Sequence, residues 1–148
     1  MWEWVAENWF DLLSSVGIIG GLIFTAVTLH SETKTRRVAN LLTMTQNHRE
    51  LWKGFYRNVE MTRILDPAAD PKSSPVNRGE EIYIITVIQH LAAVYRAMRY
   101  DLTIRPEGMG RDVGSFFSLP IPKWVWDKIK PFQDKDFVAF VDECLRAS

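Results

Sequence analysis

The sequence predicts an all-helical protein, with an N-terminal transmembrane helix followed by a small cytosolic helical bundle. An uncharged and almost wholly apolar run, VGIIGGLIFTAVTL, extends from Val16 to Leu29, and basic residues follow it directly. Apolar residues recur at three- and four-residue spacing through two later segments, which is typical of amphipathic helices. No alternating strand pattern of useful length and no internal repeat occurs. We therefore expect residues 1–30 to be the anchor and residues 31–148 the cytosolic all-helical domain.

The anchor is predicted from length and from its flanking residues. A bilayer core of ~30 Å requires about 20 helical residues, so the run must extend back to Trp9. This longer segment includes Asp11 and Ser14 near one end, where polar side chains can reach the interface. Trp2, Trp4 and Trp9 gather at the same end, as in an aromatic belt at a membrane surface.

The charge distribution predicts the orientation. The first thirty residues contain three acidic residues and no Lys or Arg, whereas Lys34, Arg36 and Arg37 follow the apolar run. Because positive charge marks the cytoplasmic side, we expect a membrane protein of one span, with its N-terminus outside and its C-terminal domain cytoplasmic. A secretory signal peptide would have a basic start and a small-residue cleavage site, and neither is present. A buried core helix would not explain the asymmetry of tryptophan and charge.

One face of the predicted span is small and polar. Residues that recur at steps of three and four share this face, and all but one are acidic, small or hydroxylated: Glu7, Asp11, Ser14, Ile18, Gly21, Thr25 and Thr28. Gly17 adds a GxxxG pair with Gly21. In lipid, helices associate through close backbone approach and polar contacts, so small residues mark the interface. This small-polar face, with Gly17, therefore predicts a homo-oligomer, while the opposite apolar face suits membrane lipid.

The acidic end of the small-polar face bears on the kind of assembly. In a parallel ring, Glu7 and Asp11 would repeat around the outer mouth, where like charges repel unless water or cations lie between them. This favours a ring around a conduit over a simple dimer. Ser14, Thr25 and Thr28 would line its wall, and Ile18 would form a constriction.

Composition limits the rest of the chain. With 148 residues and 47% hydrophobic content, there is room for one membrane segment and one small domain. Seven basic residues against three acidic ones lie between Ser31 and Arg63, an excess that suits anionic lipid headgroups, a nucleotide or RNA. The ordinary alternative is a solvated helix face. Cys144 is the single cysteine, which excludes an intrachain disulfide.

The cytosolic domain divides into five predicted helices. The first covers residues 31–65, a Pro-rich loop covers 66–79, and the second helix covers 80–102. Short helices follow near 111–117, 123–130 and 134–146, with Asp134 as the N-cap of the last. Aromatic residues crowd this C-terminal third and either close the bundle or form a docking surface between subunits: Phe116, Phe117, Trp124, Trp126, Phe132, Phe137 and Phe140.

The sequence contains no recognisable catalytic, cofactor or metal motif. There is no P-loop, and the glycines of residues 108–114 follow no strand. Cys and His spacing for zinc is absent. His48 and His90 lie on or beside the apolar faces of the two main helices, where they could face each other as hydrogen-bonded core residues or as an acid–base pair. A HEPN ribonuclease motif would need His where Thr62 follows Arg57 and Asn58, which argues against RNA cleavage.

Two segments carry a family resemblance. NLLTMTQNHRELW and FFSLPIPKWVWDKIKPFQDKDFVAFVDECL resemble uncharacterised bacterial proteins with an N-terminal anchor and a small helical domain. That family brings no catalytic residues to transfer. The architecture is also similar to the CRISPR-associated membrane accessory proteins of type VI-B systems, which assemble as rings from an anchor and a degenerate HEPN-like bundle. This similarity implies an antiviral effector that permeabilises the inner membrane.

Three functions therefore stay open at the level of sequence. The first is a non-enzymatic, self-associating membrane effector of antiviral defence, controlled by its cytosolic domain. The second is a membrane-tethered binding module for a protein, nucleotide or RNA partner. The third is an enzyme that depends on His48 and His90.

Overall fold

The computed structural model describes the backbone of residues 2–104 and 108–147, and leaves aside the side chains of residues 2–8, 10–13, 15 and 16. All secondary structure within these residues is helical, which confirms the all-α prediction. In chain order, the elements are α1 (Trp2–Arg57), η1 (Val59–Leu65), α2 (Arg78–Arg99), α3 (Met109–Ser118), α4 (Pro120–Ile129), η2 (Lys130–Phe132) and α5 (Lys135–Ala147).

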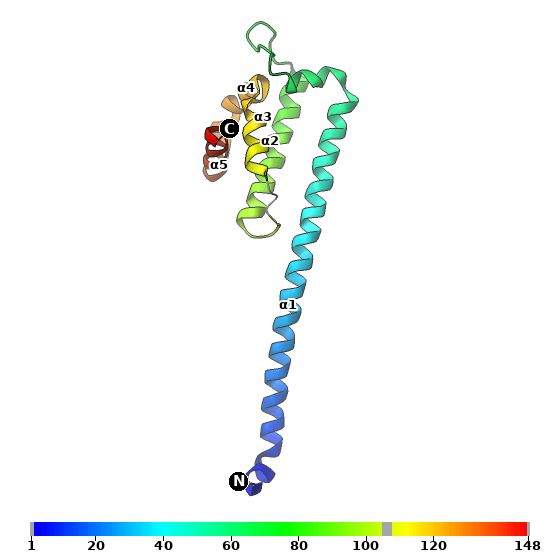
Figure 1. Cartoon of the computed structure of the whole chain (residues 1–148), viewed down its shortest axis with the longest axis vertical. Helices are drawn as coiled ribbons and strands as arrows, with labels where there is room; N and C mark the ends of the chain where they lie inside the picture. The colour runs from blue at the N-terminus through cyan, green and yellow to red at the C-terminus, as the bar shows by residue number, and fades with distance from the viewer. Residues whose placement is uncertain (1, 105–107, 148) are drawn as a thin grey trace.

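Helix α1 is one continuous rod that extends far beyond the rest of the molecule (Figure 1). Its 56 residues correspond to about 84 Å at 1.5 Å per residue. No proline precedes Pro67, so nothing in this segment removes a backbone donor from the helical ladder. The rod passes residues 30 and 31 without interruption. The division into residues 1–30 and 31–148 stays a prediction about environment, because the backbone has no boundary there.

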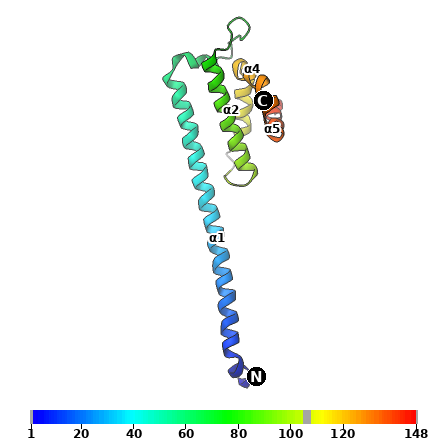
Figure 2. The ribbon, with the colours of Figure 1, turned by 180° about the vertical axis from the view of Figure 1, so that it is seen from behind.

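The first cytosolic helix ends earlier than expected. The pattern predicts a helix through residue 65, but α1 ends at Arg57 and η1 is a separate 3₁₀ helix. Asn58 adopts an extended conformation (φ −122°, ψ 102°), and its side-chain oxygen accepts a hydrogen bond from the Glu60 amide at 3.2 Å. Asparagine side chains compete with helical hydrogen bonds in this way, so Asn58 ends α1 and starts η1. The chain then turns across to α2, as the view from behind shows (Figure 2).

Helix α2 has a complete N-terminal cap. The Asn77 side chain accepts from the Glu80 amide at 2.9 Å, and the Glu80 carboxylate accepts from the Asn77 amide at 2.8 Å. This reciprocal pair satisfies two backbone donors that the helix itself cannot satisfy. At the other end, α2 stops at Arg99 rather than at residue 102, and Asp101 turns the chain with a φ of +58°.

The short C-terminal helices lie close to their predicted positions. Pro120 occupies the first turn of α4, where its missing N–H costs no hydrogen bond. The Asp134 side chain accepts from the amides of Asp136 at 3.0 Å and Phe137 at 3.2 Å, which confirms it as the N-cap of α5.

The core is formed mainly by α2 to α5. Phe117, Trp126 and Phe137 form an aromatic cluster, with ring centroids 5.0 Å apart in the first pair and 5.8 Å in the second. None of the three is more than 1% exposed, so they close the bundle, as one of the two interpretations predicted. Trp124 and Phe132 instead remain exposed at its surface.

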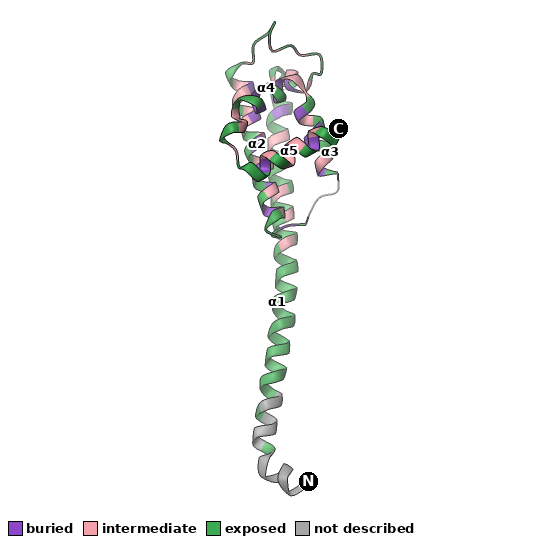
Figure 3. Cartoon of the chain, turned by 90° about the vertical axis from the view of Figure 1, so that its left-hand side faces the viewer, coloured by how far each residue is buried: buried purple, intermediate pink, exposed green. Residues whose placement is uncertain are grey.

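Helix α1 packs loosely against this bundle. Among its described side chains, only Phe55 is buried. Figure 3 shows the same division, with buried positions concentrated in the bundle and the described part of the projecting rod exposed. Judged on the residues that the structure describes, none of the helices combines the length and apolar character that crossing a membrane requires. Within the predicted span from Trp9 to Leu29, the side chains of residues 10–13, 15 and 16 lie outside the described part.

Candidate functional site

The projecting part of α1 exposes many large apolar side chains. Between Ile18 and Leu29, seven large apolar side chains are 57–73% exposed: Ile18, Ile19, Leu22, Ile23, Phe24, Val27 and Leu29. They belong to both the small-polar face and the face opposite. At Gly17 and Gly21, a Cβ atom would meet nothing within 4 Å apart from the adjoining residues and the nearby backbone of its own helix. No part of the described bundle covers this section.

The threonines of the small-polar face are already hydrogen-bonded within α1. The Thr25 hydroxyl donates to the Gly21 carbonyl at 2.8 Å, and the Thr28 hydroxyl donates to the Phe24 carbonyl at 2.9 Å. Such bonds allow threonine to lie in an apolar setting without a partner from another helix. These threonines therefore offer a second helix a small side chain, and no unpaired hydrogen-bond donor.

Other residues predicted for the anchor are described only in part. Ser14 is exposed, and so is Trp9 at 58%. The side chains of Glu7, Asp11, Trp2 and Trp4 lie outside the described residues, so their predicted roles at the pore mouth and membrane interface stay predictions.

The predicted basic cluster is partly used within the fold. Arg37 pairs with Asp101, and the Asn40 side chain donates to the Leu102 carbonyl at 2.8 Å, so α1 is fastened to the segment that follows α2. Arg36 lies 3.7 Å from Glu32, while Lys34 is exposed. Ion pairing of Arg36 and Arg37 reduces the positive charge that this cluster offers to headgroups or RNA.

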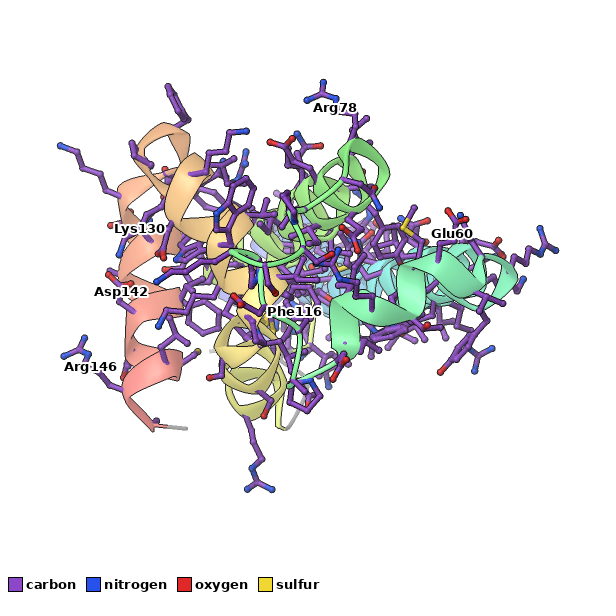
Figure 4. The ribbon with its side chains drawn as sticks, turned by 90° about the horizontal axis from the view of Figure 1, so that it is seen from above. Glu60, Arg78, Phe116, Lys130, Asp142 and Arg146 are labelled. Carbon is purple, nitrogen blue, oxygen red and sulfur yellow. The ribbon has the colours of Figure 1, made fainter. Side chains whose placement is uncertain are left out.

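A cavity of about 630 Å³ is lined by residues of α1, α2 and α3. This volume is typical of a small-molecule site, for which about 300–1,000 Å³ is usual. Its described lining is mostly apolar and comes from α1, η1, α2, α3 and the segments beside them: Leu41, Met44, Thr45, His48, Leu51, Trp52, Phe55, Leu65, Tyr83, Val87, His90, Leu91, Val94, Thr103, Ile104, Met109, Asp112, Val113, Ser115, Phe116 and Leu119. We call it the α1–α3 cavity. Its Phe116 lies near the middle of the molecule when viewed end-on (Figure 4).

The two predicted histidines meet in the wall of this cavity. The rings of His48 and His90 have centroids 5.7 Å apart. Trp52 Nε1 donates to His48 Nε2 at 2.7 Å. Because the indole nitrogen is only a donor, His48 Nε2 must be the acceptor, and in the neutral ring Nδ1 carries the proton. The lone pair that a general base would use is therefore occupied in His48.

Burial sets the charge state of His90. Desolvation lowers its pKa below the ordinary value of 6.5, and repulsion from His48 lowers the pKa further. At pH 7, His90 is therefore neutral. Burial also raises the pKa of Tyr83, whose hydroxyl donates to the Leu51 carbonyl at 2.7 Å.

Thr103 is a further polar residue of the cavity that sequence reasoning missed. It is 4% exposed, and its hydroxyl is a buried group with no hydrogen-bond partner. Three such groups occur among the described side chains, and only that of Thr103 lines the α1–α3 cavity. A buried hydroxyl without a partner is costly, so its position calls for an explanation.

An ion pair with a fully buried carboxylate was also missed. Glu80 is fully buried, and both its carboxylate oxygens accept from Arg63 Nη1 at 3.1 Å. The other end of the Arg63 guanidinium donates to the Ser74 carbonyl, so one charge pair joins η1, the 66–77 loop and α2. The spacing of Asn77 and Glu80 is the signature of a capping box and was the available signal.

Thr62, which stands where a HEPN motif would need His, has a structural role, as does a further ion pair. The Thr62 hydroxyl donates to the Val59 carbonyl at 2.6 Å, within the same η1 turn that Asn58 caps. The Lys130 ammonium contacts Asp142 at 2.7 Å at the outer edge of the bundle (Figure 4). Across the described residues, no three His, Cys, Asp or Glu side chains are grouped to hold a metal ion.

Comparison with known proteins adds no relative to this description. No protein-family model, no curated protein and no solved structure matches the chain.

Proposed function

We propose that this chain is a single-span inner-membrane protein that self-associates through α1 and carries its helical bundle in the cytoplasm. The observation that carries the proposal is the uncovered apolar section from Ile18 to Leu29. A large group of exposed apolar side chains marks a surface that another protein or a membrane covers. The bundle that follows leaves this section uncovered, and we assign its cover to lipid and to other copies of α1.

Exposure of this section to water carries a large free-energy cost. Full burial of a large aliphatic or aromatic side chain contributes about 1.5–3 kcal/mol. Seven such side chains are more than half exposed here, so covering them is worth on the order of 10 kcal/mol. This is comparable with the total stability of a small domain. An isolated chain in water would therefore tend to aggregate through this section.

Self-association is supported by the small residues of the same section. Gly17 and Gly21 leave open space beside the helix axis, so a second backbone can approach closely there. The hydroxyls of Thr25 and Thr28 already donate to carbonyls of α1, so these side chains can pack against a second helix without leaving a hydroxyl donor unpaired. The opposite face carries larger apolar side chains, including Ile19, Ile23 and Val27, and suits lipid.

The specific form of this proposal is a ring with a conduit, acting as a pore-forming effector of antiviral defence. It rests on the predicted ring of Glu7 and Asp11 and on the resemblance to ring-forming accessory proteins. Reconstituted protein should release a small dye from sealed phosphatidylcholine vesicles, and Ile18→Trp should slow that release by closing the constriction. Vesicles that retain the dye under all conditions would contradict the pore while leaving the membrane anchor unaffected.

The assembly is tested by particle size. Full-length protein in detergent should form a defined oligomer, and Gly21→Leu together with Thr25→Leu should reduce it to monomers because leucine keeps the backbones apart. Ile19→Leu together with Ile23→Leu is the matched control on the opposite face and should leave the oligomer intact. Unchanged mass in the Gly21/Thr25 variant, measured by light scattering, would overturn self-association through this face.

The location is tested separately. The full chain should stay with membranes after alkaline carbonate extraction. A reporter that is active only in the cytoplasm should be active when it is fused after Ser148. Recovery of the chain in the aqueous fraction as a monomer would overturn the membrane proposal.

The α1–α3 cavity favours a second candidate, a membrane-tethered binding module. In that case α1 serves only as a tether, and an unrelated single-span helix placed before Ser31 should preserve every binding property. Loss of binding on such a replacement would instead link the cavity to the packing of the anchors.

A further inference from the structure

The α1–α3 cavity extends along α1. Seven residues of α1 line it between Leu41 and Phe55, at steps of one and three residues, so they share one face. The 14 residue steps from Leu41 to Phe55 correspond to about 21 Å along the helix. An elongated apolar channel of this kind matches an extended alkyl chain better than a compact ring system.

The charge of the lining limits the head group of any ligand. No Lys or Arg occurs among the described residues that line the cavity, and Asp112 adds a negative charge. His90 is kept neutral by burial and by His48. A carboxylate or phosphate placed here would lose its water without gaining a cation, which strongly disfavours an anionic ligand.

A hydrogen-bonding group is nevertheless available at one end. Thr103 is 4% exposed, and its hydroxyl has no partner within the described structure. The bond from Asn40 to the Leu102 carbonyl at 2.8 Å places the Thr103 segment beside Leu41, at the end of the cavity nearer the projecting rod. A hydroxyl or carbonyl of a ligand would satisfy Thr103, and the protonated His48 nitrogen provides a second donor along the wall.

We infer that the α1–α3 cavity binds an uncharged single-chain amphiphile, with a long alkyl chain along α1 and a hydroxyl or carbonyl head at Thr103. The inference deepens the proposed function, because such a ligand would be the signal that the bundle passes to the anchors. Its test is independent of assembly, since labelling of the cavity and particle size are separate measurements.

The test compares two photoreactive probes that differ only in charge. Full-length protein in phosphatidylcholine nanodiscs is irradiated with a diazirine-bearing C18 alcohol or with the C18 acid of the same chain. Labelled peptides are then identified by mass spectrometry. We expect the alcohol to label residues 41–55 and 109–119, and excess unlabelled alcohol to remove this label. The acid should label the same peptides at least ~10-fold less, because its charge would be buried without a partner.

Two variants separate binding from folding. Thr103→Val keeps the shape of the side chain and removes the unpartnered hydroxyl, so labelling should fall about 5-fold while the melting temperature stays equal or rises. Thr86→Val is the matched control, because the Thr86 hydroxyl lies outside the cavity and is bonded to the Ile82 carbonyl at 2.9 Å. Ser115→Trp, at an exposed position of the lining, should fill the cavity and reduce labelling without loss of stability.

Three outcomes would overturn the inference. The first is equal labelling of the cavity peptides by the alcohol and the acid. The second is labelling that excess alcohol does not reduce, which would indicate simple partitioning. The third is the absence of cavity label with both probes, as expected if a second copy of the chain occupies the cavity. In each case the oligomer size of the same samples reports separately on self-association.

Discussion

At the scale of single residues, the most consequential contact is the ion pair between Arg63 and Glu80. The Glu80 carboxylate has no exposed surface, and its other partner is the Asn77 amide in the cap of α2. Arg63 is 28% exposed and also reaches the Ser74 carbonyl. Because Arg63 contacts the loop and Glu80 contacts the cap of α2, this ion pair connects η1, the loop and α2.

Arg63→Ala should destabilise the protein by about 3 kcal/mol, because it leaves the buried Glu80 carboxylate without its cation. Urea unfolding of the full chain in detergent, followed by circular dichroism, measures this change. Lys53→Ala is the control, since Lys53 pairs with Glu50 at an exposed site and should change stability by less than about 0.5 kcal/mol. Similar losses in the two variants would contradict the role of burial.

His90 should make stability fall as the pH is lowered. Its folded pKa lies below the unfolded value of about 6.5, so the unfolded chain binds a proton first as the pH drops. Its contribution is complete above pH ~6.5, declines through the interval down to the lower folded pKa, and is fully lost below it.

Replacing this histidine should flatten the pH profile. His90→Gln should reduce the loss of melting temperature between pH 7.5 and pH 5, because glutamine does not titrate. His30→Gln changes an exposed histidine of α1 and should retain the slope. An identical profile in the wild type and the His90 variant would show that other groups control the effect.

At the scale of elements, the α5 cap offers a direct test of local structure. Asp134→Ala removes the acceptor for the Asp136 and Phe137 amides and should cost about 1 kcal/mol in unfolding free energy. Asp134→Asn keeps an acceptor oxygen and should change stability by only a few tenths of that amount. Thermal melts measure the stability of both variants. An equal loss of stability in the two would contradict the capping role.

At the scale of the whole molecule, the bundle should fold without the projecting rod. The described residues from Gly17 to Ser31 are exposed and make no buried contact with the bundle, whereas Phe55 is buried against it. A chain that begins at Ser31 should therefore be soluble, helical and monomeric, with nearly the melting temperature of the full chain. Loss of cooperative unfolding in this shorter chain would show that residues before Ser31 belong to the bundle.

The elements whose cause is local were predicted well. The Pro-rich segment before Asn77 disrupts helices by removing backbone donors, and Asp134 signals a helix start by its side-chain acceptor. The end of α1 was placed eight residues too late, because the apolar spacing continues past Arg57 while Asn58 diverts the backbone. Periodicity describes which side is buried, but a single capping side chain decides where a helix stops.

The candidate site was predicted only in its parts. The apolar spacing of His48 and His90 was visible in the chain, and their rings do lie 5.7 Å apart. The cavity that they line depends on how closely α1 approaches α2, which no local pattern encodes. Thr103 and Arg63 act through partners or spaces that are distant in the sequence, so their burial could not be foreseen from their neighbours.

The sequence by itself determined the helical class, the loop before α2, the cap of α5 and an apolar segment that the bundle does not cover. These features follow from side-chain periodicity, proline and capping chemistry, which act over a few residues. Only the tertiary structure decided that Phe55 of α1 is buried against the bundle, that Arg63 meets Glu80 and that Thr103 faces an unfilled space. Those outcomes depend on distances between helices, and such distances are set by the packing of all the elements together.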